Sequence, residues 1–531
     1  MSELAHEIKR RRTFAIISHP DAGKTTLTEK LLLYGGAIQT AGSVAARKNR
    51  KKTTSDWMEL EQQRGISVTT TVLQFEYMDH VLNLLDTPGH QDFSEDTYRT
   101  LMAADAAVML LDNARGVEPQ TIKLFKVCRQ RGIPIFTFVN KMDRPGMDRL
   151  ELLEQLEEVL GIGSIPINWP IGDGPDFKGV YSRQTREVHL YERTEHGSKK
   201  APVMAADLAD PKLADLLGRT RLQQLTEEIE LLDGAGEELD MQAVLNGKLT
   251  PVFFGSAITN FGVELFLESF IEMAPAPIAR EAGDEIISPD CPDFRGLVFK
   301  IQANMDPNHR DRIAFMRVIS GKFERDMMVT NPRLGRQIRL TRPQKLFAQD
   351  RVITEVAYPG DIVGLTNPGV FAIGDTLSTG PVVSFTNFPR FTPEHFMHLR
   401  NRRIEKYKQF LKGIQQLSEE GVVQLFYELD ASSKEPILGA VGQLQFEVVQ
   451  YRLQAEYGVE TILDALPYEM VRWPHASPEA ISGIRWRTGC RPVRDAFENV
   501  AGLFTGEWSL RYLQEDYPEI AFRDEPPVRQ A

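Results

Sequence analysis

Short apolar runs alternate with helical patterns along the first third of the chain. The runs are rich in β-branched residues, which is typical of strands covered on both faces. They are Thr13–Ser18, Val81–Asp86, Ala106–Asp112, Ile133–Asn140 and, later, Val252–Gly255. Helical patterns at Thr25–Tyr34 and Gln120–Gln130 lie between them. Strands that alternate with helices predict a parallel sheet with helices on both faces, an α/β domain over residues 1–280.

A different pattern interrupts this rhythm between residues 144 and 250. The sequence predicts a helix over Leu150–Leu160 and a Gly- and Pro-rich loop over Gly161–Val180. Residues 205–240 carry many acidic side chains at helical spacing, which favours a solvated helical face. We therefore expect an insertion near residues 150–250 of the first domain.

The second third of the chain consists of short alternating runs. Four prolines among charged residues predict a linker over residues 274–296. Turn residues then separate the runs, which predicts an antiparallel β-barrel domain over residues 281–388. The runs are Gly296–Ile301, Ile313–Ser320, Met327–Asn331, Gln337–Leu340 and Ile362–Leu365.

The last part of the chain mixes both periods. Helical spacing covers Leu399–Gln416 and Gln443–Tyr457, and strand-like runs lie at Val422–Leu429 and Ile437–Gly442. This order predicts an α+β domain over residues 389–531. Residues 468–531 show mixed short elements and no recognisable chemistry. The protein is thus predicted to be multidomain.

Composition excludes several classes of protein. The 531 residues are 42% hydrophobic and carry a net charge of −12, which is ordinary for globular domains and unlike a general DNA coat. Only three cysteines are present, far apart in the sequence, so neither a disulfide framework nor a Cys-rich zinc site is supported. No apolar run approaches the length of a membrane span, and the N-terminus has no apolar stretch of signal-peptide type. We expect a cytoplasmic protein that binds neither DNA nor membranes.

The strand at 13–18 leads into a segment that resembles a phosphate-binding loop. Gly23, Lys24 and Thr25 keep the end of the pattern GxxxxGK[ST], while Ser18 replaces the first glycine. Backbone N–H groups of such a loop face phosphates, the lysine reaches the β- and γ-phosphates, and the hydroxyl binds Mg²⁺. The predicted phosphate-binding residues are Ser18, His19, Pro20, Asp21, Ala22, Gly23, Lys24 and Thr25.

Two further segments follow predicted strands. The first, Asp86-Thr87-Pro88-Gly89-His90, places an acid where it can hold Mg²⁺ and a glycine where a backbone N–H can meet a γ-phosphate. The second, Asn140-Lys141-Met142-Asp143, identifies the base. Guanine presents two adjacent donors, the ring N–H and the exocyclic NH₂, and an ionised Asp143 accepts both.

The triplet Gly255-Ser256-Ala257 follows a fourth strand, and its backbone N–H groups can donate to the guanine O6. It carries little information alone and gains weight from its place in the order. Parallel sheets bind ligands at the carboxyl ends of their strands, where all four segments are expected. The sequence therefore predicts a guanine nucleotide pocket.

These segments resemble those of translational GTPases, the group that includes elongation factor G. Asp56–Ser67 is similar to the switch I segment of that group, with Ser67 where relatives often have a Mg²⁺-binding threonine. Phe299–Arg312, Gln416–Gly421 and Gly439–Phe446 resemble the release factor branch of bacteria.

This resemblance implies a monomeric GTPase that uses GTP and Mg²⁺, acts on the ribosome and removes class I release factors after peptide release. It also implies that Thr25, Ser67 and Asp86 hold the metal and that His90 is catalytic because it positions the attacking water. Two alternatives stay open. One is a translocation or ribosome-protection GTPase like elongation factor G, and the other is a scaffold that binds GTP.

Two basic clusters stand out from this acidic chain. One cluster is expected on the helix at 399–416. It either forms a solvated face of the helix or contacts ribosomal RNA or protein. It consists of Arg400, Arg402, Arg403, Lys406, Lys408 and Lys412. The other lies inside the predicted switch I, which we expect to be mobile without GTP. It consists of Arg47, Lys48, Arg50, Lys51 and Lys52.

Overall fold

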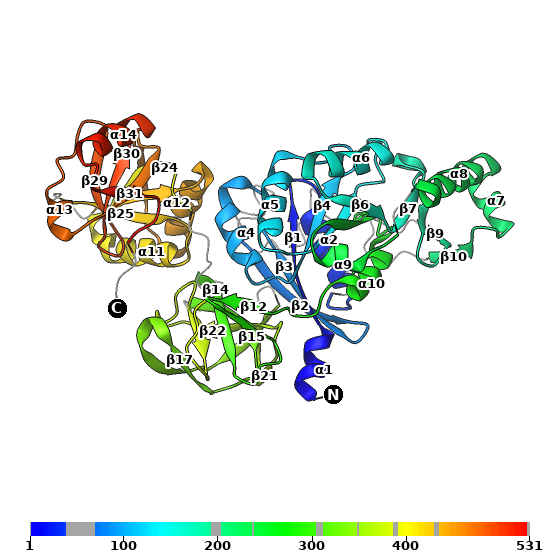
Figure 1. Cartoon of the computed structure of the whole chain (residues 1–531), viewed down its shortest axis with the longest axis horizontal. Helices are drawn as coiled ribbons and strands as arrows, with labels where there is room; N and C mark the ends of the chain where they lie inside the picture. The colour runs from blue at the N-terminus through cyan, green and yellow to red at the C-terminus, as the bar shows by residue number, and fades with distance from the viewer. Residues whose placement is uncertain are drawn as a thin grey trace.

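Figure 1 shows the computed structural model of the chain. It describes residues 2–38, 69–192, 203–235, 238–303, 312–347, 350–385, 391–429 and 435–527. The first domain lies in the middle of the view, its insertion extends to one side, and the C-terminal domain lies on the other. A third, barrel-like body packs below, close to the N-terminal helix. Within the described residues, no helix has both the length and the apolar character needed to cross a membrane.

A seven-stranded sheet forms the centre of the first domain. Its order is β2-β3-β1-β4-β5-β11-β6, and all neighbours are parallel except β2, which pairs antiparallel with β3. Burial along β1 and β4 is continuous because both faces of the sheet are covered. The strands are β1 (Arg11–Ser18), β2 (Thr71–Tyr77), β3 (His80–Asp86), β4 (Ala106–Asp112), β5 (Ile135–Asn140), β6 (Gly163–Pro166) and β11 (Leu249–Phe254).

Neighbouring residues of β1 contribute to different cores. Ile17 belongs to one core together with Leu124 of α5, whereas Ile16 belongs to the other with Leu31 of α2 and Phe266 of α10. This alternation is the strand period of two, and it fixes which helices cover each face. The helices are α2 (Lys24–Tyr34), α4 (Ser94–Leu101), α5 (Pro119–Gln130), α6 (Arg149–Gln155) and α10 (Val263–Met273). The α/β prediction is confirmed.

The insertion holds an antiparallel sheet in the order β10-β9-β8-β7. The prediction of a loop over 161–180 was wrong, because β6, β7 and the start of β8 lie there. Pro170 misled the prediction, since proline is tolerated in β7 only because this strand lies at the sheet edge. The elements are the π-helical turn Leu156–Leu160, β7 (Asn168–Ile171), β8 (Gly179–Ser182), β9 (Glu187–Tyr191), β10 (Val203–Asp207), α7 (Lys212–Leu217), α8 (Arg219–Ala235) and α9 (Met241–Leu245).

The barrel domain is an antiparallel sheet in the order β18-β17-β23-β14-β15-β22-β19-β20 that surrounds an apolar core. Its strands are β14 (Arg295–Ala303), β15 (Arg312–Ser320), β17 (Met328–Asn331), β18 (Arg336–Arg339), β19 (Pro343–Phe347), β20 (Asp350–Ile353), β22 (Ile362–Thr366) and β23 (Thr376–Ser378). A short pair, β16 (Phe323–Glu324) and β21 (Val356–Ala357), adds to it. The predicted linker contains a hairpin, β12 (Arg280–Ala282) and β13 (Glu285–Ile287).

The C-terminal domain is built on a sheet in the order β27-β24-β26-β25-β29-β30-β28-β31. Residues 468–531, for which no role was predicted, supply four of these strands and two helices. The strands are β24 (His395–Asn401), β25 (Gln424–Glu428), β26 (Ile437–Ala440), β27 (Thr461–Ala465), β28 (Met470–His475), β29 (Cys490–Asp495), β30 (Val500–Phe504) and β31 (Ala521–Arg523). The helices are α11 (Tyr407–Glu419), α12 (Gln443–Tyr457), α13 (Pro478–Ser482) and α14 (Glu507–Asp516).

The prediction of a helix from Leu399 was wrong at its start. Leu399 lies in β24 opposite Leu463 of β27; Leu399 is in the apolar core of this domain and Leu463 packs against that core. The helix begins only at Tyr407. Pairing with a strand far along the chain overrides the local pattern, as is common for residues that fit either element.

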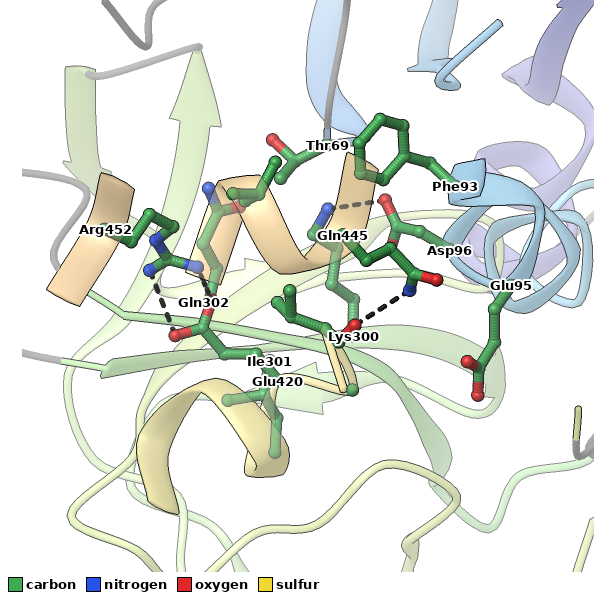
Figure 2. A pocket seen from close by; sticks show the side chains of 13 residues that line it. Thr69, Phe93, Glu95, Asp96, Lys300, Ile301, Gln302, Glu420, Gln445 and Arg452 are labelled. Atoms are coloured by element: carbon green, nitrogen blue, oxygen red, sulfur yellow. Dashed lines mark hydrogen bonds and ion pairs between the residues drawn. The ribbon is translucent and has the colours of Figure 1, made fainter. Parts of the chain in front are cut away.

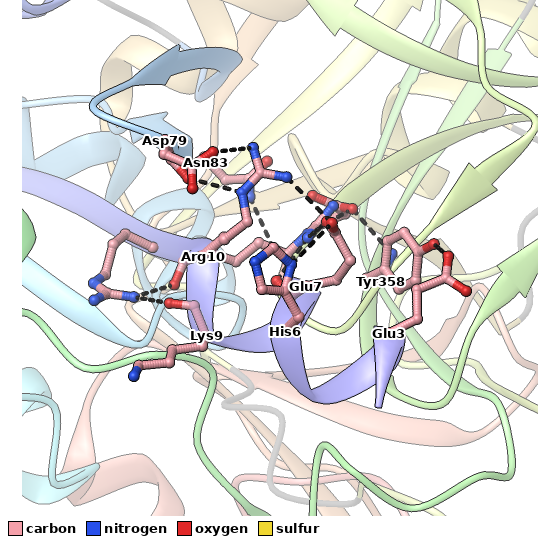
Figure 3. Close-up of polar contacts among 12 residues, drawn as sticks. Glu3, His6, Glu7, Lys9, Arg10, Asp79, Asn83 and Tyr358 are labelled. Carbon is pink, nitrogen blue, oxygen red and sulfur yellow. Dashed lines mark hydrogen bonds and ion pairs between the residues drawn. The ribbon is translucent and has the colours of Figure 1, made fainter. Parts of the chain in front are cut away.

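The N-terminal helix α1 (Glu3–Arg10) connects the first domain to the barrel domain. Figure 3 shows its polar contacts, in which Glu7 binds the guanidinium groups of Arg10 and Arg11. Arg11 also pairs with Asp361 of the barrel domain at 2.9 Å and lies 4.8 Å from the ring centre of Tyr358. The two domains therefore share a charged interface around α1.

A second charged contact between the same domains lies deeper. Arg317 of β15 is 2% exposed, and its guanidinium pairs at 2.5 Å with the fully buried Asp105 of the first domain. Arg280 binds the other oxygen of Asp105 at 2.7 Å. Burial lowers the pKa of Arg317 and the carboxylate of Asp105 opposes that shift, so the ion pair stays formed.

Candidate functional site

The phosphate-binding segment forms a tight loop between β1 and α2. Ser18 is the last residue of β1 and α2 begins at Lys24. Gly23 has φ +98°, and a Cβ there would lie 2.4 Å from Nδ2 of Asn140. Only glycine fits this position, because both the backbone angle and the space exclude a side chain. The loop thus presents its N–H groups and the N-terminus of α2 to one point.

Lys24 and Asp86 meet at the carboxyl ends of β1 and β3. Nζ of Lys24 lies 2.6 Å from Oδ1 of Asp86, and both side chains are buried. Among the described residues, Oδ2 of Asp86 and Oγ of Ser18 are buried without a hydrogen-bond partner. Buried polar atoms of this kind usually bind something. A carboxylate oxygen of this kind and a hydroxyl such as that of Thr25 are the oxygen donors that Mg²⁺ prefers.

Asn140 ties three loops together. It lies at the end of β5 and is 2% exposed. Its Nδ2 donates to the carbonyl of Ala22 at 2.9 Å, and its Oδ1 accepts from the N–H of Ala257 at 2.9 Å. One side chain therefore joins the phosphate loop, the Asn140–Asp143 loop and the 255–257 loop.

Lys141 makes a second tie. Its Nζ donates to the carbonyl of Asp21 at 2.5 Å and to Oδ2 of Asp112 at 2.7 Å. Burial would raise the pKa of Asp112, but the Lys141 ammonium and the Ala114 N–H hold it below its ordinary value. Sequence reasoning missed Asp112, although its place at the end of β4 put it on the same sheet edge.

Asp143 lies against the 255–257 loop. The hydroxyl of Ser256 donates to Oδ1 of Asp143 at 2.6 Å, which fixes the carboxylate while leaving Oδ2 for another donor. The N–H of Ser256 donates to the carbonyl of Phe261 at 2.9 Å. Since the N–H of Ala257 is used by Asn140, this geometry does not favour either N–H as a donor to guanine O6.

The remaining predicted residues support these loops. Thr87 donates its hydroxyl to the carbonyl of Ile16 at 2.6 Å, and Met142 is buried. A Cβ on Gly89 would lie 3.5 Å from the backbone of Pro20, so the Asp86–His90 segment passes close to the phosphate loop. His19 lies 3.4 Å from Glu118. Ser67, the other residues of the Asp56–Ser67 segment and the basic cluster at 47–52 lie outside the described residues.

His90 sits at the start of a short 3₁₀ turn, Gln91–Phe93, that leads into α4. Its side chain is 30% exposed, and its Nδ1 accepts from the N–H of Asp92 at 3.2 Å. The ring is thus held locally through Nδ1, which leaves Nε2 as the ring nitrogen outside this contact.

The basic cluster of the C-terminal domain does not lie on one helix. Arg400 is on β24 and pairs with Asp464, and Arg403 precedes α11 and pairs with Glu460 at 2.8 Å. Lys408 and Lys412 lie on α11. The acidic partners neutralise part of the positive charge, so the cluster is weaker than its sequence indicates.

Three family models match the chain. "Elongation factor Tu GTP binding domain" matches residues 9–276, "Elongation factor G domain 2" matches 293–380, and "Class II release factor RF3, C-terminal domain" matches 385–514. A crystal structure of a protein from Thermus thermophilus has the same fold, with a TM-score of 0.68 and 25% identity. It covers 92% of this chain, and 72% of that chain is matched.

Curated relatives match almost the full length. "Peptide chain release factor 3" of Nostoc punctiforme is 58% identical over 527 residues, which is 99% of this chain and 97% of the relative. The proteins of the same name from Synechococcus elongatus and Symbiobacterium thermophilum are each 57% identical. They cover 99% and 98% of this chain, and 95% and 99% of the relatives. The predicted resemblance, guanine nucleotide binding and GTPase activity are confirmed. This chain belongs to the peptide chain release factor 3 family, and it is a translational GTPase of termination.

Proposed function

We propose that this protein acts as a monomer in the cytoplasm and uses GTP to remove class I release factors from the ribosome after peptide release. The observation that carries the proposal is the pairing of two parts in one chain. A nucleotide pocket whose loops are tied together is joined to a C-terminal domain of the class II release factor type. We also propose the domain division 1–280, 281–388 and 389–531.

In this proposal, Asp143 determines the selectivity of the pocket for guanine. Oδ2 of Asp143 and the shared Oδ1 accept the two guanine donors as a charge-assisted pair. Ser256 holds the carboxylate in place at 2.6 Å, so little side-chain entropy is lost when the base binds. Lys141 would pack its stem over the purine, while its ammonium stays anchored by Asp112.

The phosphates would bind in the Gly23 loop at the N-terminus of α2. Lys24 would exchange its contact with Asp86 for the β- and γ-phosphates, which frees both oxygens of that carboxylate. Thr25, Ser67 and Asp86 are the residues that would hold Mg²⁺, which supplies charge neutralisation for the transferred phosphoryl group.

His90 would position the attacking water. Phosphoryl transfer depends on alignment and charge stabilisation more than on a strong base. The imidazole is 30% exposed, and among the described residues it is held by contacts with Asp92 and Phe93 of the same turn. The free protein should therefore bind GTP but cleave it slowly, and the ribosome should supply the missing alignment.

The test is GTP turnover in three conditions: protein alone, with vacant ribosomes, and with a termination complex that carries a labelled class I factor. We expect stimulation by ribosomes and GTP-dependent loss of the label. Stimulation without loss of the label would favour a translocation or ribosome-protection role. An absence of stimulation would contradict a ribosomal GTPase cycle and leave a GTP-binding scaffold.

A further inference from the structure

The first, barrel and C-terminal domains meet beside α4. A cavity of about 40 Å³ lies at this junction, between Phe93 and Asp96 of the first domain, Lys300 of β14 and Gln445 of α12. Figure 2 shows the side chains that line it. Asp96 binds Lys300 at 3.1 Å and also the N–H of Thr70 at 2.7 Å. The segment that follows His90 is therefore in contact with both other domains.

Asp92, two residues after His90, caps a helix of the C-terminal domain. Its Oδ2 accepts from the N–H of Leu444 at 2.8 Å, in the first turn of α12. The N-cap residue that precedes this helix is Gly442, which has no side chain to accept from the first turn. Helix N-termini favour a carboxylate that accepts from their free N–H groups. Gln445 of α12 accepts from the N–H of Gly442 at 3.0 Å, and the first domain supplies the acceptor for the N–H of Leu444.

The fit around this contact is close. A Cβ added to Gly442 would lie 2.1 Å from Cγ of Asp92, although Gly442 has extended φ and ψ angles of −139° and 157° that any residue adopts. Glycine is therefore required here by the approach of Asp92 and not by its own backbone. Asp92 is 8% exposed, so the contact is largely shielded from water.

The same residues set the position of His90. Asp92 donates its N–H to Nδ1 of His90 at 3.2 Å, and its Oδ1 lies 3.3 Å from the same atom. The ring of Phe93 lies 6.2 Å from the imidazole, at 61°, and packs with Val448 of α12 in a small apolar cluster. Two adjacent residues therefore connect the imidazole to one helix of the C-terminal domain.

We propose that Asp92 is a positioning residue that couples the orientation of His90 to the docking of α12. While α12 is docked, its N-terminus fixes Asp92, and Asp92 holds the imidazole against its own turn. Displacement of the C-terminal domain removes the partner of Asp92 and lets the imidazole turn toward the γ-phosphate. This inference rests on the proposed function, because it requires that the ribosome displaces α12 from the first domain.

The test is Gly442→Ala, which changes no atom of the nucleotide pocket. The added methyl group should push α12 away from Asp92. We expect single-turnover GTP cleavage without ribosomes to rise about fivefold, which corresponds to ~1 kcal/mol, the usual worth of a helix cap. GTP affinity should stay unchanged. The matched control is Gly483→Ala in the same domain, where a Cβ would meet only ordinary contacts at 3.4 Å or more.

Asp92→Ala removes the same contact from the other side and introduces no clash. It should raise the ribosome-free rate similarly, and the double variant should add nothing further, as expected for two halves of one interaction. Unchanged or slower ribosome-free cleavage in both single variants would overturn the proposal. Ribosome stimulation of the parent protein is measured separately, so loss of that stimulation would count against the proposed function and not against the coupling.

Discussion

Asn140→Ala is the most informative change to the nucleotide pocket. The amide makes two buried hydrogen bonds to backbone groups of other loops, the carbonyl of Ala22 and the N–H of Ala257, both at 2.9 Å. Alanine removes both and leaves the two backbone groups without their partner. The three loops would then have to be ordered by the nucleotide itself.

The size of the effect follows from these contacts. A neutral hydrogen bond contributes about 1 kcal/mol net, and a buried group left unpaired costs roughly 1–3 kcal/mol. Because water can reach the emptied pocket and relieve part of that cost, we expect a total of about 2–4 kcal/mol. If the whole of this free-energy cost appears as weaker nucleotide binding, GDP affinity falls roughly 30- to 900-fold.

The assay is stopped-flow release of fluorescent GDP, together with urea unfolding of the nucleotide-free protein. Asn168→Ala is a matched control, because Asn168 is fully buried and also makes two hydrogen bonds to backbone, both to Phe254 at 3.1 and 2.7 Å. Both variants should lose stability, but only Asn140→Ala should release GDP much faster. Equal acceleration in the two variants would refute the idea that Asn140 acts as a tie between loops.

Three further predictions concern the site and its surroundings. Asp143→Asn replaces an acceptor by a donor, so GTP affinity should fall by roughly 2–4 kcal/mol while xanthine nucleotides gain relative affinity. Competition binding tests this, and unchanged GTP affinity would contradict the assignment. His90→Ala should keep nucleotide and ribosome binding but slow ribosome-stimulated single-turnover cleavage on the order of 10²-fold. A rate within a few-fold of the parent would remove His90 from the mechanism. Burial would raise the pKa of Asp96, but the Lys300 ammonium and the N–H of Thr70 hold it below its ordinary value. The stability that Asp96 contributes should therefore be complete above about pH 4, near its unfolded pKa, and be lost as the pH falls further. The urea stabilities of Asp96→Asn and the parent should converge as the pH falls below about 4, and a constant difference would speak against this ion pair.

The sequence predicted the parallel sheet and the nucleotide pocket well, because both depend on local patterns. Apolar runs define β1, β3, β4 and β5, and the chemistry follows each strand directly. Contacts between distant segments were not predictable. Leu399 carries a helical pattern yet pairs in β24, and the edge position of β7 is what permits Pro170.

Long-range contacts also explain what sequence reasoning missed within the site. In the sequence, Asp112 is an ordinary acidic residue at a strand end, and its role depends on the contact with Lys141. The role of Asp92 likewise depends on its contact with the N-terminus of α12, which lies far away in the sequence. A close approach by glycine, as at Gly442, leaves no signal in the sequence when the backbone angles are common ones.

The buried pair of Arg317 and Asp105 determines how the domains assemble. If Arg317 is buried against the first domain without pairing with Asp105, its charge is uncompensated, which costs roughly 3–5 kcal/mol. Partly docked arrangements of the barrel domain are therefore penalised. Together with the contacts of Arg11 to Asp361 and Tyr358 of the barrel domain, this makes them a single cooperative unit. In calorimetry the two domains should melt in one transition, with the C-terminal domain free to melt separately.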